Sequence, residues 1–273
     1  MKKKRKSIFI SMTRFIMLAA ILIPAATLFL WIFTERWTWP DLVPQVFSGR
    51  AVLEIAGRKK ELLKILWSSI FISSVVAALS AVIGIMTARA ILFYRFPGKQ
   101  MVYFFTILPF MVPATVFAMG IQITFIKMGL NNRITGVIIA HLICSLPYAV
   151  RLIMDGTAAV GSRLEEQARV LGASPFQAFY KTSLPMLMPV ILSAVSMSYI
   201  VSFSQYFLTL MIGGGNVKTF TILMVPYLQS GNRNIACIYS TLFLGVTLLV
   251  FGVFEWAACR FMKHGGGEFY TSE

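Results

Sequence analysis

Long apolar segments separated by short polar ones dominate the chain. Six of these segments are long enough to cross about 30 Å of hydrocarbon as helices, at a rise of about 1.5 Å per residue. They run from about residue 15 to 33, 65 to 88, 101 to 126, 134 to 154, 184 to 212 and 235 to 261. The pattern therefore predicts an all-α integral membrane protein with six transmembrane helices.

Glycine and proline interrupt this pattern at three places. The segment at 101–126 contains Pro109 and Pro113, so we expect this helix to kink inside the bundle. The segment at 184–212 ends at Gly213-Gly214-Gly215, which we interpret as a flexible end of the span rather than a ligand-binding loop. The apolar stretch at 220–228 is too short to cross a bilayer, and we expect a re-entrant or surface segment there.

Composition and charge support a membrane protein. Of the 273 residues, 58% are hydrophobic and only 13% are charged, which excludes an ordinary soluble domain. The formal net charge is +15, but the basic residues flank the apolar segments instead of forming one amphipathic face. This distribution is typical of charges that flank the membrane lipid and set the topology, and it argues against nucleic-acid binding.

The charge distribution places both termini in the cytoplasm, because the N-terminus and the later inner loops are basic. The first outer loop is also basic, which conflicts with the rule that basic loops stay in the cytoplasm. We keep the topology, because longer loops cross the membrane largely regardless of their charge. The basic residues of that loop are Arg36, Arg50, Arg58, Lys59, Lys60 and Lys64.

Three parts follow from this organisation. Residues 1–64 hold a basic segment, the first transmembrane helix and the outer loop; residues 65–261 form a five-helix core; and residues 262–273 form a polar tail. Cysteines at 144, 237 and 259 and histidines at 141 and 264 stand apart from one another. We therefore expect no metal site.

A polar loop at 162–185 interrupts the core and is expected to form two short helices. Ser162 and Glu165 have the spacing of a capping box, and carboxylates at 165 and 166 suit the positive end of a helix dipole. Gly172 is expected to end the first helix in a left-handed conformation. Ser174-Pro175 then starts the second helix.

The second helix of the loop places Phe176, Phe179 and Tyr180 on one face, by their three- and four-residue spacing. The loop therefore presents aromatic rings and a pair of carboxylates away from the bilayer. Its local chemistry alone is equally compatible with an ordinary cytoplasmic loop.

The wider pattern resembles a known family. Glu166-Gln167-Ala168, three residues, Gly172 and finally Leu184-Pro185 resemble the EAA loop of binding-protein-dependent ABC importer permeases. Gln167 replaces the first small residue of that motif, and Thr182 replaces its isoleucine. Residues 95–99, 141–148 and 202–210 are also similar to this family, particularly to its polyamine, thiamine and ferric-iron branch. Ser204 and Gln205 stand where that branch often carries acidic or amide residues. The loss of a carboxylate there weakens the case for a cationic substrate.

The resemblance implies the type I ABC importer permease fold, with the loop as a cytoplasmic coupling-helix hairpin in a bacterial inner-membrane protein. It also implies a cytoplasmic ABC ATPase dimer, a second permease subunit of a different chain and an extracytoplasmic solute-binding protein. The transported substrate would be a small polar solute such as a polyamine. The residues expected to couple to the ATPase are Glu165, Glu166, Ala168, Gly172, Ser174, Pro175, Phe176, Phe179 and Tyr180.

Nucleotide chemistry is expected in a partner. The chain contains no Gly-x-x-x-x-Gly-Lys-Ser/Thr motif, so ATP and Mg²⁺ would bind the ATPase and this chain would be neither an enzyme nor a cofactor-binding protein. Within the membrane, Ser198, Ser202, Gln205 and Tyr206 share one helical face and are predicted to line the translocation pathway. For the serines, packing between helices is the alternative.

Two other classes of function are alternatives to an importer permease. An ATP-independent secondary transporter calls for an internal repeat or a buried ionisable residue, and neither is evident in the sequence. A membrane-embedded enzyme calls for convergent catalytic groups, but His141 and Asp155 lie near opposite ends of one span.

Overall fold

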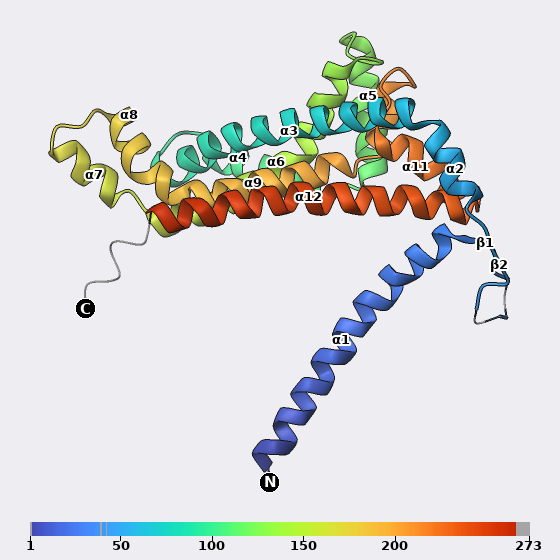
Figure 1. Ribbon diagram of the computed structural model, residues 1–273. Helices are drawn as coiled ribbons and strands as arrows, with labels where there is room; N and C mark the ends of the chain where they lie inside the picture. The colour runs from blue at the N-terminus through green and yellow to red at the C-terminus, as the bar shows by residue number, and fades with distance from the viewer. Residues whose placement is uncertain (1, 39, 42, 266–273) are drawn as a thin grey trace. The chain divides into compact units, whose positions relative to one another are not determined.

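The computed structural model describes residues 2–38, 40–41 and 43–265, and it is overwhelmingly helical (Figure 1). The predicted tail at 262–273 begins inside the last helix, and from residue 266 onward it lies outside the described residues. The chain divides into two compact units. The first comprises Met1–Leu63 and Leu223–Val246, and the second comprises Lys64–Ile222 and Thr247–Glu273.

The first unit begins with a long apolar helix, which is followed by a pair of short strands and a short helix. Helix α1 (Lys2–Ile32) is followed by strands β1 (Thr34–Arg36) and β2 (Val46–Phe47), which pair antiparallel, and by helix α2 (Arg50–Gly57). The ring of Trp31 stacks on that of Trp37 at 5.1 Å, and the Arg233 guanidinium lies 5.0 Å from the Trp31 ring centroid. Stacked rings and a cation over a ring therefore hold the C-terminal end of α1.

The second unit contains most of the membrane helices and the polar loop. Its elements are α3 (Lys59–Phe93), α4 (Lys99–Met111), α5 (Ala114–Lys127), α6 (Ile134–Val160), α7 (Arg163–Val170), α8 (Pro175–Ala178), the π-helical turn η1 (Phe179–Ser183), α9 (Leu184–Phe203), α10 (Phe207–Gly213), α11 (Phe220–Gln229) and α12 (Arg233–Gly265). Helices α3, α11 and α12 continue into the first unit.

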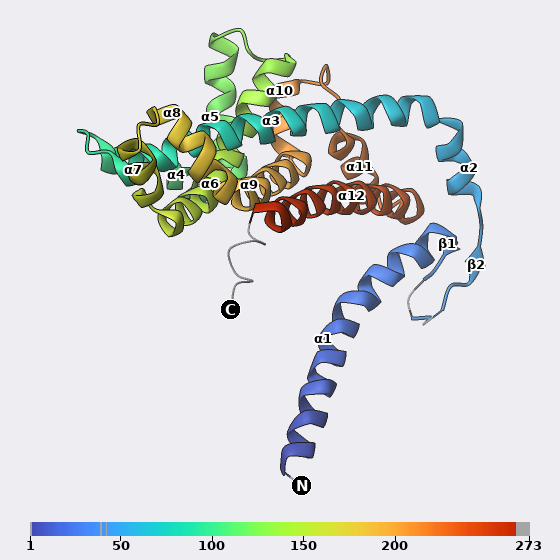
Figure 2. The same ribbon diagram turned by 60° about the vertical axis from the view of Figure 1, so that its left-hand side comes forward.

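Helices α6 and α9 make the most extensive helix contact and lie side by side in both views (Figures 1 and 2). Gly156 on α6 permits this approach, because a Cβ atom there would lie 2.8 Å from Val190 Cγ1 and 2.9 Å from Val190 Cγ2. Small residues commonly let membrane helices approach closely in this way. A separate buried cluster joins α3, α6 and α10 through Val76, Val137 and Leu208.

The number of continuous spanning helices differs from the prediction. Five helices in the described part of the chain are long and apolar enough to cross a membrane, and the predicted span at 101–126 is instead divided into α4 and α5. Val112 is extended (φ −98°, ψ 127°), as is typical of a residue before proline, and Pro113 starts α5. Pro109 stays inside α4.

The predicted span at 184–212 also differs. Helix α9 ends at Phe203, and α10 starts only at Phe207 after a break. Gly214 (φ 51°) then caps α10 in a left-handed conformation. Helix α11 has ten residues, which is too short to cross a bilayer and matches the expectation for this stretch.

Candidate coupling hairpin and polar helix interface

Helix α7 is bounded by a glycine on each side. Gly161 (φ 69°) caps the end of α6, and Gly172 (φ 92°) follows Leu171, the C-cap of α7. A Cβ atom at either position would meet no heavy atom within 4 Å, so backbone conformation alone requires glycine at Gly172. The predicted left-handed end of the first loop helix is confirmed, and the two glycines form joints on either side of α7.

The predicted capping box at Ser162 is wrong. Ser162 is nearly helical (φ −97°, ψ −13°) instead of extended, and its side chain makes no capping hydrogen bond. The reciprocal half of the box is also missing, because the Glu165 carboxylate binds Arg89. A capping box occurs at the second helix instead. The Gln177 backbone N–H donates to Ser174 Oγ at 3.3 Å, and the Ser174 backbone N–H donates to Gln177 Oε1 at 3.1 Å.

The second loop helix is not a separate element. Helix α8 continues through η1 into α9, which gives one helix from Pro175 to Phe203. The Thr182 hydroxyl donates to the Ala178 carbonyl oxygen at 2.5 Å within the π-helical turn. Isolated π-helical turns inside α-helices are frequent at functional sites. Helix α8 is therefore continuous with the membrane helix α9.

Glu165 points inward and forms an ion pair with Arg89 on α3. Arg89 Nη1 and Nη2 donate to Glu165 Oε1 and Oε2 at 2.6 and 2.8 Å, and the side chains are 19% and 13% exposed. The guanidinium carbon lies 4.4 Å from the Phe179 ring centroid and 5.4 Å from that of Phe93. The hydrogen bonds from Arg89 lower the pKa of Glu165, although partial burial acts in the opposite direction.

Large apolar and aromatic side chains of the loop are exposed. Val170 and Leu171 are 87% and 88% exposed, and Phe176 and Tyr180 are 74% and 58% exposed. The Phe176 and Tyr180 rings stack with centroids 6.1 Å apart. We call these four residues the hairpin apolar surface.

The remaining predicted coupling residues divide between the two sides of the hairpin. Glu166, Ser174 and Pro175 are exposed, and Ala168 is half-buried. Phe179 was expected in an outward aromatic group, but it contacts Arg89 instead. The sequence analysis predicts no coupling role for Val170, but its side chain is exposed. The sequence feature that could have revealed it is an apolar pair, Val170-Leu171, placed directly before the glycine that follows a polar helix.

The predicted pathway residues lie at a helix interface. Ser198 and Ser202 on α9 are 0% and 2% exposed. His141 on α6 connects this region, with Nδ1 3.0 Å from Ser202 Oγ and Nε2 2.8 Å from Thr209 Oγ1 on α10. For Ser202 the structure matches the alternative of packing between helices. The sequence pattern indicates no role for His141, because its partners are distant in sequence.

Gln205 and Tyr206 lie at the break between α9 and α10, and both are half-buried. The Gln205 carbonyl oxygen accepts hydrogen bonds from the hydroxyls of Thr209 (3.0 Å) and Thr221 (2.9 Å). These bonds compensate for backbone groups that the broken helix leaves unpaired. Of the four predicted pathway residues, these two retain some surface exposure.

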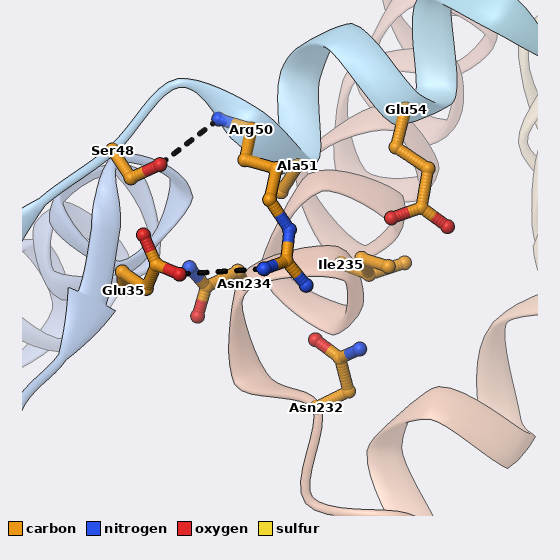
Figure 3. Close-up of a pocket in the computed structure, with 8 residues that line it drawn as sticks. All are labelled: Glu35, Ser48, Arg50, Ala51, Glu54, Asn232, Asn234 and Ile235. Carbon is orange, nitrogen blue, oxygen red and sulfur yellow. Dashed lines mark hydrogen bonds and ion pairs between the residues drawn. The ribbon is translucent and has the colours of Figure 1, made fainter.

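The first unit contains a polar pocket of about 240 Å³ between β1, α2 and the start of α12 (Figure 3). Arg50 Nη1 lies 3.5 Å from Glu35 Oε1, with Asn234 nearby and Glu54 on the other side of Arg50. Both members of this ion pair are exposed, so it contributes at most about 1 kcal/mol. Among the described residues, no group of three or more histidine, cysteine or acidic side chains could hold a metal.

Comparison with known proteins places this geometry in a family. The sequence profile described as "Binding-protein-dependent transport system inner membrane component" matches residues 80–258. The molybdate/tungstate transport system permease protein WtpB of Pyrococcus abyssi is 28% identical over 189 residues, which cover 69% of this chain and 75% of that protein. The spermidine/putrescine permease protein PotC of Haemophilus influenzae is 27% identical over 163 residues, covering 60% and 63% of the respective chains. The sulfate permease protein CysT of Escherichia coli is 25% identical over 248 residues, covering 84% of each chain.

Solved structures share the fold at low sequence identity. A bacterial alginate ABC transporter in complex with an alginate pentasaccharide-bound periplasmic protein matches with a TM-score of 0.64 and 14% identity, over 92% of this chain and 96% of that chain. The MetNI methionine ABC transporter in an inward-facing conformation matches with a TM-score of 0.55 and 18% identity, over 74% of this chain and 95% of that chain. The profile match covers more than half of the sequence, and the chain belongs to the family of binding-protein-dependent transport system inner membrane components, as a multi-pass permease subunit of an ABC importer whose ATP is hydrolysed by a partner subunit.

Proposed function

We propose that the loop at 162–185 is the element through which a separate cytoplasmic ATPase dimer drives this permease. The observation that carries the proposal is the hairpin apolar surface, where Val170 and Leu171 are 87% and 88% exposed at the end of a helix of eight residues. Such a helix is too short and too polar to be buried in lipid. Exposed apolar groups rimmed by polar residues are typical of protein interaction sites.

The residues of the hairpin would have different roles in this docking. The exposed carboxylate of Glu166 can accept charge-assisted hydrogen bonds from basic groups of the ATPase. Phe176 and Tyr180 would enter an apolar groove as one stacked pair. Ala168, Ser174 and Pro175 shape the two helix ends.

The assembly proposed around this chain contains a second permease of a different sequence, an ATPase dimer that binds ATP and Mg²⁺, and an extracytoplasmic solute-binding protein. The family description supports dependence on a binding protein. The alginate transporter, which shares the fold, was crystallised with a periplasmic protein. The proposed topology has both termini in the cytoplasm of a bacterial cell, on the same side as the hairpin.

A small polar solute is the proposed substrate, and a polyamine is one candidate. An oxyanion is the second candidate, favoured by the chemistry of the interior. In the described part of the chain, the buried polar side chains are serines, threonines and one histidine, without a carboxylate to balance a cationic solute. Among the relatives, the molybdate/tungstate and sulfate permeases are named for oxyanions, and PotC is named for polyamines.

The test is a charge reversal on the exposed face of the hairpin. Glu166→Lys should abolish co-purification of the ATPase with the full permease complex while the chain still inserts in the membrane, because the new charge would repel the basic groups proposed to bind Glu166. Glu54→Lys on α2 is the matched control, since it reverses an exposed glutamate in the outer region and should leave co-purification intact. Normal ATPase recovery and uptake with Glu166→Lys would refute the docking role.

A further inference from the structure

Among the described residues, one ion pair joins helix α7 to the membrane helix α3. No residue of α7 is buried, and the helix lies between the glycine joints at Gly161 and Gly172. The two terminal guanidinium nitrogens of Arg89 on α3, Nη1 and Nη2, donate to the Glu165 carboxylate on α7. Helix α7 also contacts α8 and η1, and this pair adds a link from α7 to a different membrane helix.

The geometry of the pair restricts both distance and orientation. A bidentate arginine–carboxylate contact aligns the guanidinium and carboxylate planes, which a single hydrogen bond would not do. The Phe179 ring lies 4.4 Å from the guanidinium carbon, so Arg89 also contacts the π-helical turn that leads into α9. A single side chain therefore contacts α7, the start of the α9 helix and its own helix α3.

We propose that Arg89 is a positioning residue that makes α7 move together with the cytoplasmic end of α3. In this role Arg89 does not touch the ATPase; it prevents α7 from rotating at its glycine joints, so that a displacement of the hairpin reaches two membrane helices at once. The inference deepens the proposed coupling function of the hairpin and rests on it. In Figure 2 the C-terminal part of α3 runs toward the side of the molecule on which α7 and α8 lie.

A distance measurement between α3 and α7 tests the positioning role of Arg89 without knowledge of the solute. Spin labels at Met86→Cys on α3 and Gln167→Cys on α7 use two exposed positions outside the hairpin apolar surface, in a chain whose cysteines at 144, 237 and 259 are replaced by serine. The labelled permease, assembled with its ATPase and partner permease, is measured by pulsed electron paramagnetic resonance before and after trapping with ATP and vanadate. With Arg89 present, the distance distribution should keep its mean and width in both states.

Arg89→Met should broaden this distribution and shift its mean on trapping by several ångströms, on the order of the helical pitch of about 5.4 Å. Glu165→Gln removes the same contact from the other side and should reproduce the effect. Arg151→Met is the matched control, because it breaks an exposed ion pair with Asp155 and should behave like the unsubstituted chain.

Four outcomes would overturn the positioning role. These are an unchanged distribution in Arg89→Met, a matching shift in the unsubstituted chain, failure of both Arg89→Met and Glu165→Gln to bind the ATPase, or an equal effect of Arg151→Met. If neither Arg89→Met nor Glu165→Gln binds the ATPase, Arg89 serves docking or folding instead. The proposed function is tested separately by ATPase recovery with Glu166→Lys. Failure of docking appears in that recovery, whereas failure of the positioning role appears in the distance distribution of a complex that still contains the ATPase.

Discussion

Replacing Gly172 with alanine separates backbone conformation from packing at the hairpin. Gly172 has φ 92°, and a Cβ atom there would meet no heavy atom within 4 Å. The expected cost is therefore the left-handed backbone penalty alone, about 1–2 kcal/mol for an L-residue other than asparagine or aspartate. The Gly172 N–H donates to Arg169 O and the Ala173 N–H donates to Ala168 O, both at 3.0 Å, and these bonds close the turn.

A change of 1–2 kcal/mol corresponds to a factor of about 5–30 in an equilibrium constant. Alanine lets the unbound hairpin relax out of the left-handed turn, so re-forming the turn on docking should weaken binding of the ATPase to the purified permease complex by up to about this factor, measured as a dissociation constant. Gly172→Asn should weaken binding less, because asparagine adopts the left-handed conformation more readily.

The matched control is Gly120→Ala on α5. A Cβ atom at Gly120 would also meet no heavy atom within 4 Å, but this glycine lies within a helix and has no positive φ. Alanine there should leave ATPase binding unchanged and favour the helix slightly. Unchanged ATPase binding in Gly172→Ala, or equal weakening in both variants, would refute the joint at Gly172.

Two further predictions concern helix packing and pH. Gly156→Ala should destabilise the α6–α9 contact by about 1–3 kcal/mol through overpacking against Val190, and Val190→Ala should restore much of the loss in the double variant, measured by thermal unfolding in detergent; a double variant no more stable than Gly156→Ala would contradict this contact. Because the pKa of Glu165 is lowered by Arg89, the folded state favours the charged carboxylate, so this stabilisation is complete above the ordinary glutamate pKa of about 4.3 and is lost as pH falls through the lower folded pKa. Thermal unfolding followed from neutral to acidic pH should show this loss in the unsubstituted chain but not in Glu165→Gln, and identical pH profiles would contradict it.

The sequence predicts the elements whose cause is local. Apolar length predicts most of the membrane helices. The left-handed turn at Gly172 and the helix start at Ser174-Pro175 depend on residues within one turn of each other, and the structure contains both. The family motif at Glu166, Gly172 and Leu184-Pro185 likewise lies within one short segment.

The features that could not be predicted depend on contacts between distant residues. Glu165 leaves the expected capping arrangement because Arg89, 76 residues earlier, offers two charge-assisted hydrogen bonds. Ser202 binds His141, which is 61 residues away, so its helical face alone does not reveal whether it meets a partner helix or a solute. The break at Val112-Pro113 was expected only as a kink, since a proline in a membrane helix bends or interrupts it depending on the surrounding helices.

The most direct test of the coupling hairpin is site-specific photocrosslinking from Leu171, which is 88% exposed beside Gly172. A photoreactive amino acid is placed at this position in the full complex in its native membrane, with the same residue at Leu53 on α2, 74% exposed, as the matched control. The coupling account predicts a crosslinked product of this chain with the ATPase subunit from position 171 and none from position 53. A product with lipid or with an extracytoplasmic protein from position 171, and none with the ATPase, would contradict it.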